Sequence, residues 1–333
     1  MIELALLAKT AGAQIVGTIT QNKDKPDLKY FIGEGKLEEL IDLAKQSGAN
    51  LVIFDNDLRP SQERNLEEQL GLKVINRTEL ILDIFAQHAA SHEGRLQVEL
   101  AQNQFMLTRL SGKGILLSRL GGGIGTRGPG ETKLEKDKRK IRYRISLLKK
   151  DLENIQKART TRRSERMSSG IKNISIIGYT NAGKSTLINA LTKSDVLVQD
   201  KLFATLDTTT RKLYISDKQS VLISDTVGFI QKLPHQLIDA FKATLDEVTD
   251  SDLLLHVVDA SNPDMEKQIS SVYTVLEELG AINKPIITVF NKTDLLTSPL
   301  DKTLAEKYKP SVYISAYKKT GLENLKEAIS TFL

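Results

Sequence analysis

Hydrophobic and polar positions in the first part of the chain follow two different periods. Apolar residues that alternate or form short runs predict strands, whereas apolar residues spaced three and four apart predict helices. The expected strands are 14–20, 51–54 and 73–75, and the expected helices are 37–46 and 60–70, the second of which opens at its proline. We therefore expect a small α/β domain with a mainly parallel sheet over residues 1–93.

The pattern then becomes purely helical. One stripe comprises Leu96, Leu100, Leu107 and Leu110, broken by Asn103, and a second comprises Leu134, Ile141, Ile145, Leu148, Leu152 and Ile155. Because two such stripes cover each other when their helices run antiparallel, residues 94–168 predict an antiparallel coiled-coil hairpin. Its glycine-rich tip, residues 111–130, is long for a helix connection, so it is either a disordered linker or a functional loop.

One motif dominates residues 169–333, which have about the length of a Ras-like nucleotide-binding domain. Its residues, Gly178-Tyr179-Thr180-Asn181-Ala182-Gly183-Lys184-Ser185, fit G-x-x-x-x-G-K-[ST], a match expected by chance in roughly one chain of this length in a hundred. A predicted strand precedes the motif, and helical spacing starts at Thr186. The backbone N–H groups of such a loop can hold a phosphate chain. We expect Lys184 to reach the β- and γ-phosphates and Ser185 to bind Mg²⁺.

A second segment supplies groups for the metal and the terminal phosphate. Asp225-Thr226-Val227-Gly228 follows a predicted strand, so Asp225 can hold Mg²⁺ through water and the Gly228 N–H can meet the γ-phosphate. The stretch before it resembles a nucleotide-sensing switch: Phe203-Ala204-Thr205-Leu206-Asp207-Thr208-Thr209-Thr210-Arg211. We predict that Thr205 completes the Mg²⁺ coordination, with Thr209 and Thr210 as alternatives, and that Lys184, Thr205 and Gly228 are the catalytic residues.

Two further segments predict which nucleotide base the site binds. Asn291-Lys292-Thr293-Asp294 follows the apolar stretch 286–290, and its aspartate can accept hydrogen bonds from N1–H and the 2-amino group of guanine. Adenine offers neither donor, so the site selects GTP. Ser315-Ala316-Tyr317 ends another predicted strand and can give a backbone N–H to guanine O6. The expected fold class is α/β, with a Ras-like P-loop GTPase domain after the small α/β domain and the hairpin.

Charge is distributed unevenly along the chain. The net charge is +5, but residues 131–166 hold 14 Lys and Arg against 6 Asp and Glu, a local excess of +8. With Lys113, Arg119 and Arg127 in the glycine-rich tip, this predicts a surface that binds RNA through its phosphates. There are no cysteines, and no apolar run approaches the ~20 residues of a membrane span. We expect a cytoplasmic monomer.

Histidine does not predict a resident metal. His88 and His92 stand four apart on an expected helix, which is a metal-ligand spacing, but no third ligand is evident.

The position after Gly228, where Ras-type enzymes carry a water-orienting glutamine, is Phe229. We therefore expect slow intrinsic hydrolysis that a partner stimulates, and we hypothesise that Asn181 helps to hold K⁺.

The motif set resembles the HflX family of translation-factor-related GTPases. The resemblance rests on Phe203–Asp207, on Asp225–Phe229 and on the glycine-rich stretch 121–131. It implies a protein that binds the large ribosomal subunit, facing ribosomal RNA with the hairpin and its tip, and that can split ribosomes. Compared with that family, we expect this chain to lack an extra C-terminal domain and to be short at its N-terminus. The alternative is a regulatory GTPase whose coiled coil binds a protein effector.

Overall fold

The computed structural model describes residues 2–120, 129–168, 171–192, 202–203, 209–215, 219–231, 247–298 and 302–333. The chain forms two compact units. The first contains residues 1–87 and 96–151, and the second contains residues 88–95 and 152–333. No helix in the described ranges is long and apolar enough to cross a membrane.

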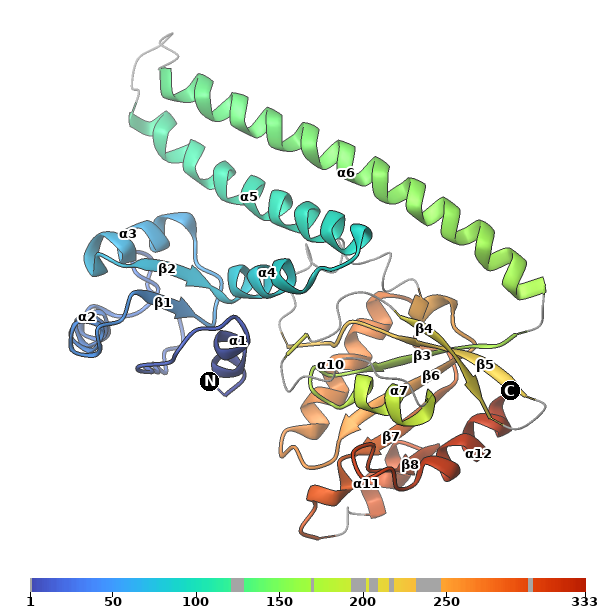
Figure 1. The fold of residues 1–333 in the computed structure, drawn as a ribbon. Helices are drawn as coiled ribbons and strands as arrows, with labels where there is room; N and C mark the ends of the chain where they lie inside the picture. Colours follow the sequence, from blue (N-terminus) through green and yellow to red (C-terminus); the bar gives the residue numbers. More distant parts are fainter. Residues whose placement is uncertain are drawn as a thin grey trace. The chain divides into compact units, whose positions relative to one another are not determined.

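The first unit begins with short helices around a small parallel sheet (Figure 1). Its elements are α1 (Ile2–Thr10), α2 (Glu34–Ser47), β1 (Leu51–Phe54), α3 (Pro60–Leu70), β2 (Lys73–Asn76) and α4 (Arg77–His88). Glycines in the left-handed conformation end two of the helices, Gly48 after α2 and Gly71 after α3. Strands β1 and β2 pair in parallel, and Leu37, Leu66 and Val74 are buried between the helices and this sheet. The predicted α/β character is confirmed.

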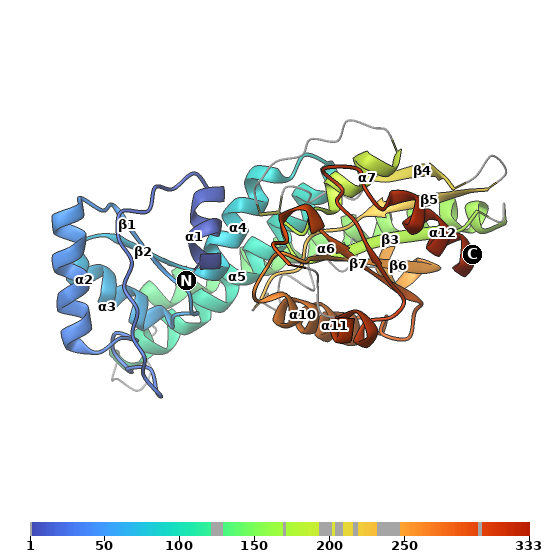
Figure 2. The same cartoon turned by 90° about the horizontal axis from the view of Figure 1, so that it is seen from below.

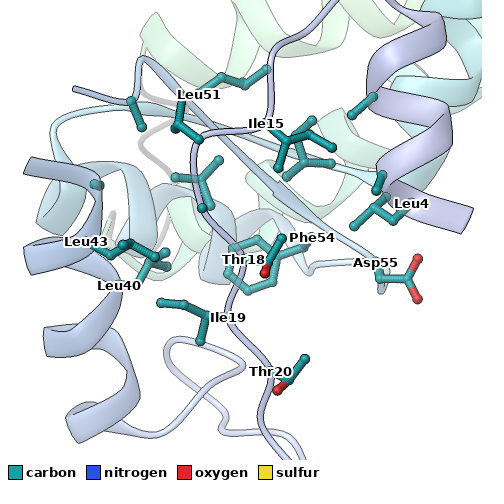
Figure 3. A pocket seen from close by; sticks show the side chains of 18 of the residues that line it. Leu4, Ile15, Thr18, Ile19, Thr20, Leu40, Leu43, Leu51, Phe54 and Asp55 are labelled. Atoms are coloured by element: carbon teal, nitrogen blue, oxygen red, sulfur yellow. The ribbon is translucent and has the colours of Figure 1, made fainter. Parts of the chain in front are cut away.

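One predicted strand is wrong, because residues 14–20 join no strand. A strand needs a hydrogen-bonded neighbour, and a groove of about 960 Å³ lies beside this segment instead. Side chains from α1, α2 and β1 line the groove, among them Leu4, Leu43 and Phe54 (Figure 3). Residues 14–20 thus run extended along one wall, while β1 forms part of another. Alternation alone did not reveal the missing partner.

The histidine pair does not lie on one helix. His88 ends α4, whereas His92 begins the next helix, α5 (His92–Leu120). The short break between them, Ala89 to Ser91, removes the i and i+4 geometry on which a metal site would depend. Within the described ranges, no group of three His, Asp or Glu side chains could hold a metal ion.

A helical hairpin is formed by α5 and α6 (Pro129–Ser168). Two ion pairs join the helices: Arg144 with Glu99 at 2.6 Å and Arg159 with Glu93 at 3.0 Å. Because the partner number on α5 falls as the number on α6 rises, the helices are antiparallel, as predicted. Leu96, Leu100 and Leu148 of the predicted stripes are buried.

The helices continue into the stretch predicted as their connection. Residues 111–120 are helical and α6 begins at Pro129, so 121–128, the centre of the predicted tip, lies outside the described residues. The glycine-rich composition of 111–130 predicts a connection, but a glycine inside a helix costs only about 1 kcal/mol. Ile115, Leu116 and Leu117 favour continuation.

The second unit contains a twisted sheet with helices on both faces (Figures 1 and 2). Its elements after α6 are β3 (Asn173–Gly178), α7 (Lys184–Thr192), β4 (Thr210–Tyr214), β5 (Ser220–Asp225), β6 (Leu253–Asp259), α10 (Met265–Glu278), β7 (Ile286–Asn291), the 3₁₀ helix η1 (Thr293–Leu295), α11 (Lys302–Lys307), β8 (Ser311–Tyr313) and α12 (Leu322–Phe332). Among the described residues six strands pair in the order β4-β5-β3-β6-β7-β8. Strand β4 is antiparallel to β5, and the other pairs are parallel.

Alternate residues of the central strands face opposite layers of helix. Ile174 and Ile176 of β3 pack in a buried cluster with α7 and α12, whereas Ile177 packs in a second cluster with α10. Both clusters consist of nearly inaccessible side chains, which explains why the strands read as continuous apolar runs in the sequence. The same parallel arrangement brings the carboxyl ends of β3, β5, β6 and β7 to one edge of the sheet, where open α/β folds place their ligands.

Candidate nucleotide-binding site

The phosphate loop follows β3 directly and leads into α7, as its motif requires. Two of its glycines have positive φ, +148° at Gly178 and +92° at Gly183. A Cβ atom on Gly183 would stand 2.3 Å from the side-chain nitrogen of Asn291, and one on Gly178 would stand 2.2 Å from the Val257 carbonyl oxygen. Glycine is therefore required at both positions by backbone conformation and by close packing.

Lys184 points back over the loop. Its Nζ donates to the carbonyl oxygens of Gly178 at 3.2 Å and Tyr179 at 2.9 Å, and the side chain is buried. Burial lowers the pKa of the Lys184 ammonium to about 8, against a smaller opposing effect of the Asp225 carboxylate. A phosphate chain in the loop would supply the anionic partner that the two neutral carbonyls lack.

Ser185 and Asp225 come together from different elements. Ser185, in the first turn of α7, donates its hydroxyl to Asp225 Oδ2 at 3.0 Å, and Asp225 ends β5 with no exposed surface. The other carboxylate oxygen accepts from the Thr226 N–H at 3.0 Å. A hydroxyl and a carboxylate are hard oxygen donors of the kind that Mg²⁺ prefers, so the donor set fits this ion. In such sites Mg²⁺ neutralises charge on the β- and γ-phosphates.

The predicted switch segment is only partly described. Residues 204–208, with the predicted metal ligand Thr205, lie outside the described residues; Phe203 is buried. Of the two alternatives, Thr210 shares a hydrogen bond of 2.9 Å with the Ser224 hydroxyl. Thr209 accepts from the Asp225 N–H through its carbonyl oxygen at 3.1 Å, and its hydroxyl is buried with no hydrogen-bond partner in the described chain.

Gly228 and Phe229 pack closely against the phosphate loop. The Thr180 N–H donates to the Phe229 carbonyl at 2.8 Å, and the Phe229 N–H donates to the Gly178 carbonyl at 3.1 Å. The Phe229 side chain is buried in the cluster that contains Ile177 and residues of α10. The side chain after Gly228 is thus part of the hydrophobic core and offers no hydrogen bond to a water molecule.

Asn291 joins the phosphate loop to the loop after β8. Its side-chain N–H₂ donates to the Ala182 carbonyl and its oxygen accepts from the Ala316 N–H, both at 2.9 Å. Asn291 itself is 2% exposed. The neighbouring Lys292 forms an ion pair with Asp259 at the end of β6, at 2.7 Å. Asn291 thus ties the phosphate loop to the loop after β8, and the Lys292–Asp259 pair joins the ends of β7 and β6.

The Asp294 carboxylate is suited to accept a hydrogen bond from a base. It lies in η1, directly after β7, and its Oδ1 atom is buried without a hydrogen-bond partner among the described residues. A buried carboxylate oxygen normally has a donor, because leaving it unpaired costs about 1–3 kcal/mol or more. The N1–H and 2-amino groups of guanine are donors of the required kind.

Some contacts could not have been read from the motif. The Tyr179 hydroxyl accepts from the Gln231 N–H at 2.8 Å, and Lys292 pairs with Asp259. Tyr179 occupies a variable position of the loop motif, and Asp259 lies outside all of the motifs. Only the positions of both residues at carboxyl ends of parallel strands could have drawn attention to them.

The chain is similar to proteins of one family over almost its full length. It is 53% identical to "GTPase HflX" of Caldanaerobacter subterraneus subsp. tengcongensis, over 98% of this chain and 75% of that protein. It is 46% identical to "GTPase HflX" of Escherichia coli K12, over 98% of this chain and 78% of that protein.

The chain belongs to the HflX family of GTPases. Three family models match consecutive stretches of this HflX-family chain: "GTP-binding GTPase N-terminal" matches residues 1–86, "GTP-binding GTPase Middle Region" 88–166 and "50S ribosome-binding GTPase" 173–292. It is an enzyme that hydrolyses GTP. A solved GTP-binding protein of Sulfolobus solfataricus in complex with GDP is similar in fold, with 28% identity and a TM-score of 0.52 over 99% of this chain and 94% of that one.

Proposed function

We propose that this GTPase binds the large ribosomal subunit in its GTP state, that the hairpin makes contacts with ribosomal RNA, and that the protein splits or rescues ribosomes. The support for a ribosomal partner is the match of residues 173–292 to a family model described as 50S ribosome-binding. The observation that carries the nucleotide part is the convergence of the phosphate loop, the Ser185–Asp225 pair and the unpaired Asp294 oxygen. We further propose that the chain contains three domains, residues 1–93, 94–168 and 169–333. We also propose that the protein acts in the cytoplasm.

The proposed nucleotide contacts follow the geometry of the loop. Lys184 holds the β- and γ-phosphates, Ser185 and Asp225 hold Mg²⁺ with Thr205, and the Gly228 N–H meets the γ-phosphate. Asp294 accepts hydrogen bonds from the N1–H and 2-amino groups of guanine. Residues 315–317 approach guanine O6 with their backbone N–H groups, of which that of Ala316 donates to Asn291 in the structure. The remaining proposed contacts come from Thr186, Phe203, Ala204, Leu206, Asp207, Thr226, Val227, Lys292, Thr293 and the rest of the loop 178–183.

Switching follows from the γ-phosphate. GTP gives Thr205 and Gly228 a group to contact that GDP lacks, so the segments that carry them are held in one state and released in the other. Since Phe229 belongs to the core, the intrinsic rate is low and the ribosome stimulates hydrolysis. Equal turnover with and without purified 50S subunits would refute this part of the proposal.

The hairpin offers a basic surface, and its ion pairs show which basic residues already have an acidic partner. Arg144 and Arg159 belong to the predicted basic face of 131–166, but each is paired with an acidic residue of α5. The described basic residues of α6 that are exposed and outside these pairs include Arg139, Lys140, Arg142, Lys149 and Lys150. We propose these residues, together with Lys113, Arg119 and Arg127, as the RNA contacts.

A charge-neutralised variant tests the proposed surface. Arg139, Arg142 and Lys149 are changed together to glutamine, and the matched control changes three exposed lysines elsewhere, Lys267, Lys307 and Lys309. Both variants lose three positive charges. Binding to 50S subunits is measured at several KCl concentrations with a non-hydrolysable GTP analogue.

Only the hairpin variant should weaken binding and flatten its salt dependence. Each lost phosphate contact reduces the slope of log K against log [KCl] by about 0.7 to 0.9, so the slope should fall by roughly 2 to 3. Equal behaviour of the two variants would reject the hairpin surface. Binding that does not respond to KCl would instead favour a protein effector on the coiled coil.

A further inference from the structure

Thr180 has a buried hydroxyl that nothing in the described protein satisfies. The residue is 6% exposed, and its Oγ1 atom has no hydrogen-bond partner. Its backbone is fixed, because the Thr180 N–H donates to the Phe229 carbonyl at 2.8 Å. An unpaired buried hydroxyl destabilises a fold, so its presence in a closely packed loop requires a reason that packing does not supply.

The side chain lies where the phosphate loop meets the second switch. A Cβ atom on Gly228 would stand 2.8 Å from the Thr180 methyl carbon and 2.8 Å from Lys184 Nζ. Thr180, Lys184 and Gly228 therefore surround one point. Lys184 and Gly228 are proposed above to contact the γ-phosphate, and the third residue, Thr180, has the hydroxyl without a partner on the same side chain as the methyl carbon.

In Ras-type enzymes the residue after this glycine is a glutamine, which supplies a polar side chain here, but in this chain it is a phenylalanine. Phe229 follows Gly228 and is 2% exposed, packed with Ile177 and Val272 in the core. Thr180, whose methyl carbon lies next to Gly228, carries a buried hydroxyl on the same Cβ atom, whereas Phe229 carries no polar group.

We propose that Thr180 is a catalytic residue whose hydroxyl donates a hydrogen bond to a γ-phosphate oxygen of bound GTP. In the reaction the oxygen of water bonds to the γ-phosphorus, and the bond from that phosphorus to the β–γ bridging oxygen breaks. GDP leaves with that electron pair, and a water proton passes to the released phosphate. The Thr180 hydroxyl stabilises the charge that is redistributed over the γ-phosphate oxygens as this happens. The inference rests on the nucleotide contacts proposed above.

Two substitutions separate the hydroxyl from the shape of the side chain. Thr180→Val keeps the branched shape and removes the hydroxyl, whereas Thr180→Ser keeps the hydroxyl and removes the methyl group. The control is Thr288→Val, because Thr288 is a buried threonine of β7 in the same unit whose hydroxyl bonds to Tyr273. Measured quantities are single-turnover GTP hydrolysis, the Kd values for GDP and a non-hydrolysable GTP analogue, and the melting midpoint without nucleotide.

The proposal predicts opposite effects on catalysis and stability. Thr180→Val should hydrolyse GTP about ten to a hundred times more slowly and bind the GTP analogue less tightly, with the Kd for GDP within about twofold of the original. Its melting midpoint should stay level or rise, since an unpaired hydroxyl is gone. Thr180→Ser should keep most of the rate, and Thr288→Val should melt earlier with an unchanged rate.

Two results would overturn the proposal. One is a Thr180→Val protein that hydrolyses GTP at the original rate, and the other is a loss of GDP binding as large as the loss of GTP-analogue binding. If the unmodified protein binds neither nucleotide, the proposed nucleotide contacts fail as well, so that failure is distinguishable from a failure confined to Thr180.

Discussion

Replacing Asn291 by alanine should loosen the phosphate loop and the base loop at once. The side chain makes two buried hydrogen bonds of 2.9 Å, one to the Ala182 carbonyl and one from the Ala316 N–H. The substitution leaves both backbone groups unpaired at residues that are 1% and 2% exposed. At about 1–3 kcal/mol for each unpaired buried group, with some relaxation, the second unit should lose about 3 kcal/mol of stability.

Hydrogen exchange of the nucleotide-free chain measures this effect where it arises. Peptides that cover the phosphate loop, 178–185, and the loop after β8 should both exchange faster in Asn291→Ala, and GDP affinity should fall with them. The matched control is Asn262→Ala, which removes an exposed hydrogen bond of 2.8 Å from the Asp264 N–H and should cost no more than about 1 kcal/mol. Equal exchange in the two variants, or faster exchange in only one of the two loops, would refute the reasoning.

Four further predictions concern the nucleotide site and its surroundings. Gly228→Ala places a Cβ atom 2.8 Å from Lys184 Nζ, so single-turnover GTP hydrolysis should fall at least tenfold while GDP binding persists; an unchanged rate would contradict the packing. Asp294→Asn exchanges an acceptor for a donor, so competition binding should show at least a tenfold loss of GTP affinity and a gain for xanthosine triphosphate, and retained GTP preference would count against a contact with the base. Burial lowers the pKa of His256 to about 3, with a smaller effect of the nearby Lys184 charge, so the folded protein keeps His256 neutral while the unfolded chain protonates it below about 6.5. This contribution to stability is therefore complete above that pH and is lost as the pH falls towards 3, by about 2 kcal/mol between pH 6.5 and 4.5. The free energy of unfolding in urea should therefore fall more steeply with decreasing pH in the original protein than in His256→Gln. Parallel pH profiles of the two proteins would exclude the effect. The hypothesis that Asn181 helps to hold K⁺ predicts faster hydrolysis in KCl than in NaCl of equal ionic strength, and equal rates would dismiss it.

The sequence predicted correctly those elements that have clear local signals in their own residues. The strand 51–54 and the helix 60–70 were predicted with the bounds that the structure has, because continuous apolar runs and a leading proline are local signals. The loop and switch motifs likewise fixed which strand ends would carry polar groups. The Ser185–Asp225 hydrogen bond then follows from parallel pairing of β3 with β5.

Other features depend on partners that a single stretch of sequence does not contain. Residues 14–20 alternate like a strand, yet a strand forms only if another backbone lies beside it, and here a groove does. The sequence predicts one helix for His88 and His92, because the break of three residues between them gives no clear local signal. The unpaired hydroxyl of Thr180 is a property of how Gly228 and Phe229 pack against the loop, which no spacing within 178–185 records.

Co-sedimentation with purified large ribosomal subunits tests the central claim most directly. The chain is mixed with 50S subunits and either a non-hydrolysable GTP analogue or GDP, both with Mg²⁺, and the bound fraction is measured in the pellet. A nucleotide-controlled ribosome-binding GTPase should pellet with the subunits in the presence of the analogue and remain mainly in the supernatant with GDP. Equal binding in the two nucleotide states, or no binding in either, would contradict the account.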